Sequence, residues 1–283
     1  MRPRVRRVVR WLRTPKALAI VTLSVLAASA ASSEGVDRVG LQLVFAAGAA
    51  VAVDLVLGRL RGVPQGIPDG ALITGLIVAM VLIGNAPPSA TVAAAGIGVG
   101  SKHLLRTGEV HLFNPAAVGL LLCVALFPAG QSWWGAQADL PWPAVLLLIG
   151  CAVMVANRVH RLPTLLAFLG MYFALLLVIA LALAGALPRV AEIFRIPFLN
   201  AAIFASGFML TDPGTSPGRL RDQIWFAGIA AVGSVVSLLA ASGLWYLLAG
   251  LLAANAWWAW RRTLGVTRTV EGQSQWAGAG HGN

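Results

Sequence analysis

The stretch IPDGALITGLIVAMVLIGNAPPS, residues 67–89, decides the fold. It is an apolar run that opens at an Ile-Pro pair and closes on a polar turn containing prolines. A similar stretch, IPFLNAAIFASGFMLTDPGTSP, occupies residues 196–217. Both apolar runs are shorter than the roughly 20 residues that a helix needs to cross a bilayer core. We therefore expect two short, broken membrane segments.

The rest of the chain is equally apolar. Hydrophobic residues make up 58% of the 283 residues and charged residues only 11%, whereas about a quarter of an ordinary soluble domain is charged. This composition excludes a soluble enzyme and a disordered chain. We expect an all-α polytopic membrane protein with about ten transmembrane helices. The apolar segments run approximately over residues 17–33, 39–57, 67–84, 88–100, 113–128, 142–156, 163–187, 197–210, 222–240 and 242–260.

The basic residues support this division into spans. If the loops alternate between the two sides, 18 of the 21 Lys and Arg residues fall on the side of the N-terminal arm and three on the other. Because basic residues concentrate in cytoplasmic loops, we predict a multi-pass protein of the cell (inner or plasma) membrane with both termini cytoplasmic. A cleavable signal peptide is the alternative for the first segment, since small residues follow its apolar run at 28–30.

The net charge of +11 has the same explanation. Its charges lie singly or in pairs beside membrane ends, so we expect membrane lipid as a partner and not nucleic acid. Six of the ten tryptophans form two groups that we place at the two membrane interfaces. These groups are Trp133, Trp134 and Trp142, and Trp257, Trp258 and Trp260.

The two quoted stretches lie 129 residues and five predicted spans apart. Because an odd number of crossings reverses direction, the chain is interpreted as two inverted five-span repeats with short broken helices. The first repeat covers residues 17–128 and the second 142–260, between a cytoplasmic basic arm at 1–16 and a cytoplasmic tail at 261–283. Short, interrupted segments at corresponding positions of inverted halves indicate a central binding site.

Broken helices expose backbone groups that lipid cannot satisfy, so such segments line a cavity or hold a ligand. The polar residues in and around the two stretches are the first candidates for that site. They are Asp69, Thr74, Asn85, Asn200, Ser206, Thr211 and Asp212. Asn, Asp and Ser are also common in turns and at helix ends, and this structural role is the alternative for each of them.

Three stretches of the sequence resemble the motifs of a known family. The segment SKHLLRTGEVHLFNPAAVGLLL (101–122), with PDGALITGL before it and FMLTDPGTSP after it, is similar to the membrane-subunit family that includes RnfD and NqrB. The similarity extends from about the second span to the end. It implies a ten-span, flavin-carrying subunit of an ion-motive or electron-transfer complex, built from inverted five-span repeats. It also implies an electron-transfer subunit of an oxidoreductase complex, not a stand-alone enzyme.

The resemblance also assigns site residues. The DG, SK, FNPAA and TDP motifs, which include Phe113 and Pro213, match positions that shape the flavin region in the family. Helix N-termini and side-chain amides suit the polar edge of a flavin, and Lys102 suits a negative charge. With two residues of the broken segments, Thr74 and Asn200, the motifs give nine predicted cofactor-binding residues. They are Asp69, Gly70, Thr74, Lys102, Asn114, Pro115, Asn200, Thr211 and Asp212.

The chain departs from the family in one loop. The family attaches FMN covalently to a threonine between spans 5 and 6, but here that loop reads AGQSWWGAQADLPW (129–142), and no threonine occurs between Thr107 and Thr164. We therefore expect FMN or riboflavin to be held noncovalently. The alternatives are that the flavin has been lost, or that the chain is a short relative specialised for another partner, resembling proteins labelled UnbU.

The expected partners are cytoplasmic reductase or other redox subunits and a quinone. Haem is not expected, because His103, His111 and His160 fall in predicted loops. Asp54 is an acidic residue inside an apolar run, where it is either functional or paired with a basic side chain such as Arg59. Two other functions are compatible with the same architecture: a channel or transporter for a small solute or ion, and a membrane scaffold for a redox partner.

Overall fold

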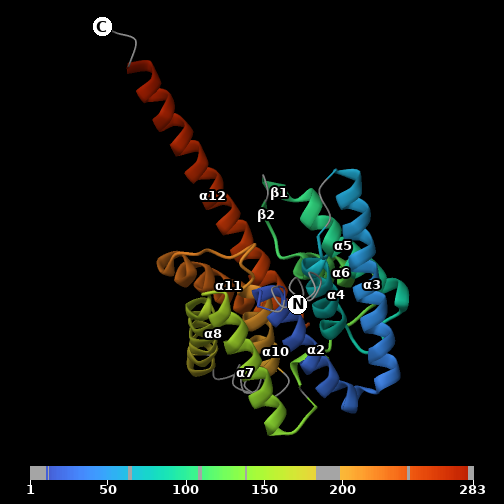
Figure 1. Ribbon diagram of the computed structural model, residues 1–283. Helices are drawn as coiled ribbons and strands as arrows, with labels where there is room; N and C mark the ends of the chain where they lie inside the picture. Colours follow the sequence, from blue (N-terminus) through green and yellow to red (C-terminus); the bar gives the residue numbers. More distant parts are fainter. Residues whose placement is uncertain are drawn as a thin grey trace.

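A computed structural model describes residue 11 and residues 13–62, 66–107, 110–137, 139–182, 198–240 and 243–279, with side chains described as far as residue 264. Its architecture is helical (Figure 1). The α-helices are α2 (Pro15–Glu34), α3 (Val36–Leu60), α4 (Asp69–Val81), α5 (Pro88–Leu104), α6 (Pro115–Leu126), α7 (Trp142–Arg158), α8 (Leu162–Ala182), α10 (Phe198–Phe204), α11 (Leu220–Ala240) and α12 (Tyr246–Ala279). A π-helical segment, Ala205–Leu210, continues α10, and a 3₁₀ turn covers Trp134–Ala136. The strands β1 (Arg106–Thr107) and β2 (Val110–His111) form a small antiparallel hairpin.

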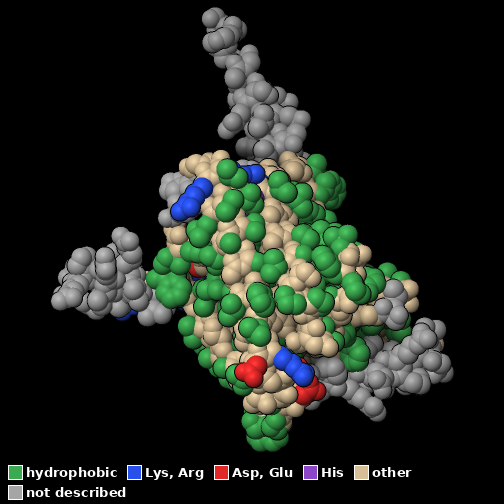
Figure 2. Space-filling view, turned by 90° about the vertical axis from the view of Figure 1, so that its right-hand side faces the viewer, with side chains coloured by type: hydrophobic (Ala, Val, Ile, Leu, Met, Phe, Trp, Pro, Cys, Tyr) green, Lys and Arg blue, Asp and Glu red, His purple; other side chains and the backbone are tan. Residues whose placement is uncertain are grey.

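Four of the described helices, α2, α3, α8 and α11, are long and apolar enough to cross a membrane. Among the shorter apolar helices, α4 packs on α2 and α3, and α6 packs on α5 and α12. Most of the charged side chains visible in Figure 2 lie near the two ends of the molecule, and hydrophobic side chains cover much of the surface between them. The chain is a helical, multi-pass membrane protein, as its composition predicts.

Local sequence explains where several helices begin. The side chain of Thr14 accepts a hydrogen bond from the backbone N–H of Ala17 at the start of α2, and Asn114 does the same for Ala117 at the start of α6. Pro15 and Pro115 occupy the first helical position in each case, where the N–H that proline lacks would be unpaired anyway.

The helices pack in two similar groups. Helices α3, α4, α5 and α6 lie on one side of Figure 1 and α8 and α11 on the other, with α2 and α10 between them. Within the first group α5 packs on α3 and α6, and within the second α11 packs on α8 and α12. The same order of pairing therefore occurs in both halves of the chain.

Glycines allow the closest of these contacts in both halves. A Cβ atom on Gly98 of α5 would lie 2.6 Å from the carbonyl oxygen of Pro115 in α6. A Cβ atom on Gly233 of α11 would lie 3.1 Å from the Cα of Gly250 in α12. Small residues at such positions let helix backbones approach each other in a membrane. Within the GIGVG stretch at 96–100, Gly98 is the glycine that serves this close packing.

Part of the loop between α6 and α7 is buried inside the protein. The sequence places Trp133 and Trp134 in an aromatic belt, but their side chains are only 1% and 2% exposed. They pack among α2, α4 and α10, and of that predicted group only Trp142, at 72%, is exposed. That part of the aromatic-belt prediction is wrong, because the loop folds back into the space beyond the short helix α4.

Helix α12 extends past the boundary expected from sequence. It continues beyond Trp260 to Ala279, across residues that the sequence assigns to a tail, and it projects from the bundle in Figure 1. The Ile-Pro pair at 196–197 lies outside the described residues, as does most of the basic arm.

Candidate functional site

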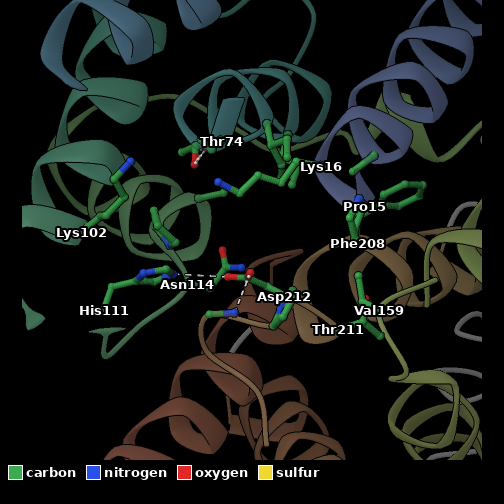
Figure 3. A pocket seen from close by; sticks show the side chains of 18 of the residues that line it. Pro15, Lys16, Thr74, Lys102, His111, Asn114, Val159, Phe208, Thr211 and Asp212 are labelled. Atoms are coloured by element: carbon green, nitrogen blue, oxygen red, sulfur yellow. Dashed lines mark hydrogen bonds and ion pairs between the residues drawn. The ribbon is translucent and has the colours of Figure 1, made fainter. Parts of the chain in front are cut away.

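A cavity of about 550 Å³ opens at the end of the bundle where α2, α4 and α6 begin and α5 and α7 end. We call this the basic end, because Lys16, Lys102, Arg106 and Arg158 lie there; the opposite end is the far end. Seven of the nine predicted cofactor-binding residues line the cavity (Figure 3). They are Gly70, Thr74, Lys102, Asn114, Pro115, Thr211 and Asp212.

The other two predicted residues lie elsewhere. Asp69 is at the mouth, where its carboxylate is 2.9 Å from the ammonium group of Lys16, a cavity-lining residue. Asn200 is fully buried near the far end and donates a hydrogen bond to the carbonyl oxygen of Gln137 at 3.4 Å. The additional polar candidates Asn85 and Ser206 do not line the cavity either; Asn85 is exposed, and Ser206 bonds to the backbone of its own helix.

Asp54 joins two cavity residues. Its Oδ1 is 2.7 Å from the ammonium group of Lys102 and 2.8 Å from Nε2 of His103. The acidic residue inside an apolar run is thus paired, and its partners come from α5. The contact fixes the two basic side chains on one wall of the cavity.

Asp212 organises the opposite wall. Its Oδ2 lies 3.5 Å from Nε2 of His111 and accepts a hydrogen bond from Thr215 at 3.2 Å, while Oδ1 accepts one from the backbone N–H of Gly214 at 3.1 Å. Burial on its own raises the pKa of Asp212, but His111 and these hydrogen bonds outweigh it and hold the pKa below its usual value. The carboxylate therefore stays ionised beside His111.

Gly214 makes room for His111 in this arrangement. A Cβ atom at position 214 would collide with the imidazole ring of His111 in its present orientation. A larger residue at this position would therefore displace the ring that contacts Asp212.

Asn114 and Asn255 tie the two halves of the chain together beneath the cavity. The Asn255 side chain accepts a hydrogen bond from the backbone N–H of Asn114 at 2.8 Å and donates one to the carbonyl oxygen of Thr215 at 3.2 Å. The Asn114 amide in turn donates to the carbonyl oxygen of Met209 at 3.2 Å. Asn114 therefore lines the cavity and also holds α6, α12 and the π-helical segment together through buried hydrogen bonds.

The π-helical segment brings Phe208 and Thr211 to the cavity. The Thr211 hydroxyl donates to the carbonyl oxygen of Gly207 at 2.6 Å, and the Thr74 hydroxyl donates to that of Gly70 at 3.0 Å. Both hydroxyls are therefore engaged by their own helices. π-helical turns occur frequently at functional sites.

Three residues of the site, His111, Phe208 and Asn255, were not identified from the sequence. The sequence marks His111 only as a histidine in a predicted loop, and Phe208 has no signal that separates it from other apolar residues of its segment. Asn255 did have one, because it is an amide inside the apolar run at 242–260, and polar residues in membrane helices are usually paired.

The cavity combines apolar walls with a basic mouth. Ile73, Ile77, Val155 and Phe208 supply apolar surface, and His111 contributes to the basic mouth together with the lysines and Arg106. The N-termini of α4 and α6 also meet the cavity, and helix N-termini favour negative charge. A volume of 550 Å³ is in the usual range for small-molecule and cofactor sites. The arrangement suits a flat, largely apolar ligand that carries polar or anionic groups at the mouth.

Within the described residues, no cluster of His, Cys, Asp and Glu is suited to a metal ion.

Comparison with known proteins gives distant similarities to two kinds of protein. No established family profile matches the chain. Over 185 residues it is 29% identical to the ESX-1 secretion system protein EccD1 of two Mycobacterium tuberculosis strains, which covers 64% of this chain and 36% of EccD1. Over 126 residues it is 32% identical to a subunit of the ion-translocating oxidoreductase complex of Pseudomonas paraeruginosa, which covers 42% of this chain and 37% of that protein. The chain therefore matches little more than a third of the length of each of these curated relatives. It is distantly similar to an oxidoreductase-complex subunit and to a secretion-system protein.

Proposed function

We propose that the chain is a flavin-binding membrane subunit of an electron-transfer system of the Rnf/Nqr kind, with the flavin held noncovalently in the basic-end cavity. The observation that supports this most directly is the convergence of seven predicted cofactor-binding residues on one cavity. The similarity to a subunit of an ion-translocating oxidoreductase complex supports the same assignment.

The residues present fit a flavin. Phe208, Ile73 and Ile77 offer apolar surface for a tricyclic ring, and Lys102, held by Asp54, offers a positive charge for an anionic ring edge or a phosphate. A bound flavin would accept and release electrons singly or in pairs. The Asp54–His103 and Asp212–His111 pairs also hold two imidazole rings at the cavity.

The composition of the loop at 129–142 supports the proposal of noncovalent binding. It lacks threonine, and its tryptophans fill the space where the loop enters the protein. Thr74 and Thr211 are the threonine side chains at the cavity, and both hydroxyls bond to backbone carbonyls.

We further propose the arrangement in the membrane. The two five-span halves run in opposite directions, a proposal supported by their similar order of helix pairing. The basic end faces the cytoplasm, supported by the distribution of Lys and Arg. A cytoplasmic reductase or other redox subunit then reaches the cavity mouth, and a quinone is the proposed partner of the membrane region. Movement of ions coupled to electron transfer is part of the same proposal, as the family implies.

The first experiment is an absorbance spectrum of the purified protein in detergent, repeated on the supernatant and pellet after acid precipitation. We expect flavin absorbance that passes to the supernatant. Flavin in the pellet would contradict noncovalent binding. Its absence from protein purified together with its redox partners would contradict the function.

A matched pair of variants assigns the site. Ala19→Phe fills the cavity from α2, whereas Val21→Phe adds the same ring to the exposed face of the same helix. We expect at least a tenfold loss of flavin from A19F and normal flavin content in V21F. Equal flavin content in the two folded variants would place the flavin elsewhere.

The second candidate function is that of a transporter or of a membrane scaffold. The similarity to a secretion-system protein supports this second candidate. Solute or ion flux through vesicles that contain this protein alone, without a redox donor and without bound flavin, would support transport over electron transfer.

A further inference from the structure

The short helices leave part of the membrane thickness to be filled. Helix α4 has 13 residues and is about 20 Å long, whereas the hydrocarbon core is about 30 Å thick. Within the described residues, α10 and its π-helical continuation together are no longer than α4. Roughly 10 Å of protein interior therefore lies beyond these helices at the far end, where backbone groups need partners.

Residues 130–137, which we call the inner loop, occupy that space. Its backbone binds the exposed C-terminal end of α4: the N–H groups of Ser132 and Trp133 both donate to the carbonyl oxygen of Val81 at 3.1 Å. The Trp134 indole N–H donates to the carbonyl oxygen of Ala79 at 2.7 Å. The inner loop thus satisfies carbonyl groups that the short helix leaves unpaired.

The inner loop also reaches the other broken helix and α2. The Trp133 ring meets the ring of Phe204 edge to face, with 6.2 Å between centroids. The Gln137 side chain donates to the carbonyl oxygen of Leu26 in α2 at 2.8 Å. The loop therefore binds α2, α4 and α10, three elements that also supply cavity walls directly or through the π-helical segment.

Close fit holds the loop in an unusual shape. Trp133 and Gln137 have φ angles of +54° and +62°, the left-handed region that non-glycine residues rarely adopt. Between them, a Cβ atom on Gly135 would lie 2.5 Å from Met80. Such conformations persist where the surroundings over-determine them.

The inner loop lies directly beyond the floor of the cavity. Ile77 lines the cavity, and Ala79, two residues or about 3 Å further along α4, accepts the bond from Trp134. Phe208 lines the cavity, and Phe204, one turn earlier, meets Trp133. Cavity and loop are therefore stacked along the same helices, with between about half a turn and one turn separating them.

We infer that the inner loop is a seal that closes the basic-end cavity against the far side of the membrane, with Trp133 and Trp134 as its closing side chains. The cavity then has access to one side only. This inference does not depend on which ligand the cavity binds.

The test uses cysteine accessibility from the two sides of the membrane. The free cysteines Cys123 and Cys151 are buried and are replaced by alanine, and a cysteine is introduced by Thr74→Cys at the cavity wall. A charged, membrane-impermeant thiol reagent is then added to right-side-out or inverted vesicles. We expect T74C to react from the side of the basic end only, and T74C with Trp134→Ala to react from both sides, at least tenfold faster from the far side than without it.

Two controls keep the outcome clear. Trp142→Ala removes an exposed tryptophan next to the same loop and should leave far-side labelling of T74C unchanged. Retained labelling from the basic side shows that the W134A protein is folded. Far-side labelling of T74C itself, or no far-side labelling in folded W134A and W133A/W134A proteins, would overturn the seal.

A second measurement leaves the loop intact, in case W134A does not fold. Single cysteines are placed along α4 and beyond it, by Thr74→Cys, Ala79→Cys and Asn85→Cys. The seal predicts labelling of T74C from the basic side only, of N85C from the far side only, and of A79C from neither. Labelling of A79C from the far side would show that the loop does not close the path.

Discussion

Asn255 does not line the cavity, but its substitution should destabilise the site more than that of any other single residue away from the cavity surface. It is fully buried and bonds both the N–H of Asn114 and the carbonyl oxygen of Thr215. Asn255→Ala leaves both groups buried without partners, and each such loss costs about 1–3 kcal/mol. We expect unfolding in detergent to become easier by about 2–3 kcal/mol.

The control for this prediction is Asn85→Ala, which removes an exposed amide and should change stability by less than about 0.5 kcal/mol. N255A and N85A proteins of equal stability, compared by thermal unfolding, would show that the bridge between the two halves contributes nothing.

Asp212 gives a pH-dependent prediction at the same scale. Its pKa is lowered from the ordinary 3.8, so the folded state favours the ionised carboxylate. The resulting stabilisation is complete above the ordinary pKa and is lost as the pH falls through the lower folded value. The stability difference between the wild type and Asp212→Asn should therefore shrink between pH 5 and pH 3.

Thermal unfolding over that range measures the difference. Arg161, which interacts electrostatically with Asp212, keeps its charge over that range. A difference that stays constant or grows on acidification would show that the carboxylate is not stabilised as an anion.

The residues of the cavity were predictable where motifs marked them. Gly70, Lys102 and Asp212 stand in recognisable motifs, and the structure brings them together; their binding of a ligand stays a prediction. Phe208 and His111 were missed, because nothing in an apolar run or a two-residue strand shows which side chain will face a cavity. Asn200 carries the same kind of signal as Asn114 but lies near the far end, since a polar residue in a broken helix can serve packing as well as binding.

Among the elements, the contact between α5 and α6 offers the sharpest test. Within the GIGVG stretch, a Cβ atom on Gly98 would lie 2.6 Å from the backbone of Pro115, whereas one on Gly96 finds its nearest neighbour, Val53, at 3.7 Å. Gly98→Ala should force the helices apart and destabilise the protein by about 1–3 kcal/mol. Gly96→Ala should be neutral or stabilising by up to about 1 kcal/mol.

Unfolding of both variants in the same detergent provides the measurement. Both substitutions replace glycine by alanine in the same helix, so both change its helix propensity by the same amount. The two variants differ only in the space around the added methyl group. Equal stabilities would mean that α5 and α6 do not approach each other so closely at Gly98.

The helices themselves were predictable from sequence. The ten α-helices of the described chain fall close to the ten predicted segments, because apolar runs and charged loops alternate sharply in a membrane protein. The inner loop was not predictable: tryptophans flanked by serine and glycine fit a membrane interface as well as a buried loop. The difference arises from the shortness of α4, whose effect appears only once the helix is placed beside its longer neighbours.

For the whole molecule, the structure places the start of α2 and the charged part of α12 at the basic end of the bundle. Arg158 donates to the backbone oxygen of Arg13 before α2, and Arg261 of α12 pairs with Asp222 at the start of α11, at 3.2 Å. Reporters fused to the N-terminus and to the C-terminus should therefore report the same side of the membrane. The charge distribution predicts that this side is the cytoplasm.

A fluorescent protein that folds only in the cytoplasm, compared with a phosphatase active only outside it, measures this directly. A reporter inserted after Asn85 should give the opposite result to both termini. Opposite results for the two termini would require an odd number of crossings and would remove the basis for two equal halves.

The position of the cavity has an electrical consequence. A water-accessible cavity carries the potential of its own side down to its floor, so the membrane voltage falls across the remaining thickness between Ile77 and the far surface. A unit charge that crosses a full potential of 100 mV does about 2.3 kcal/mol of work. An electron delivered to the cavity floor from the basic end would do almost none of that work. An electron leaving the floor for the far side would do nearly all of it, although it travels through only part of the membrane.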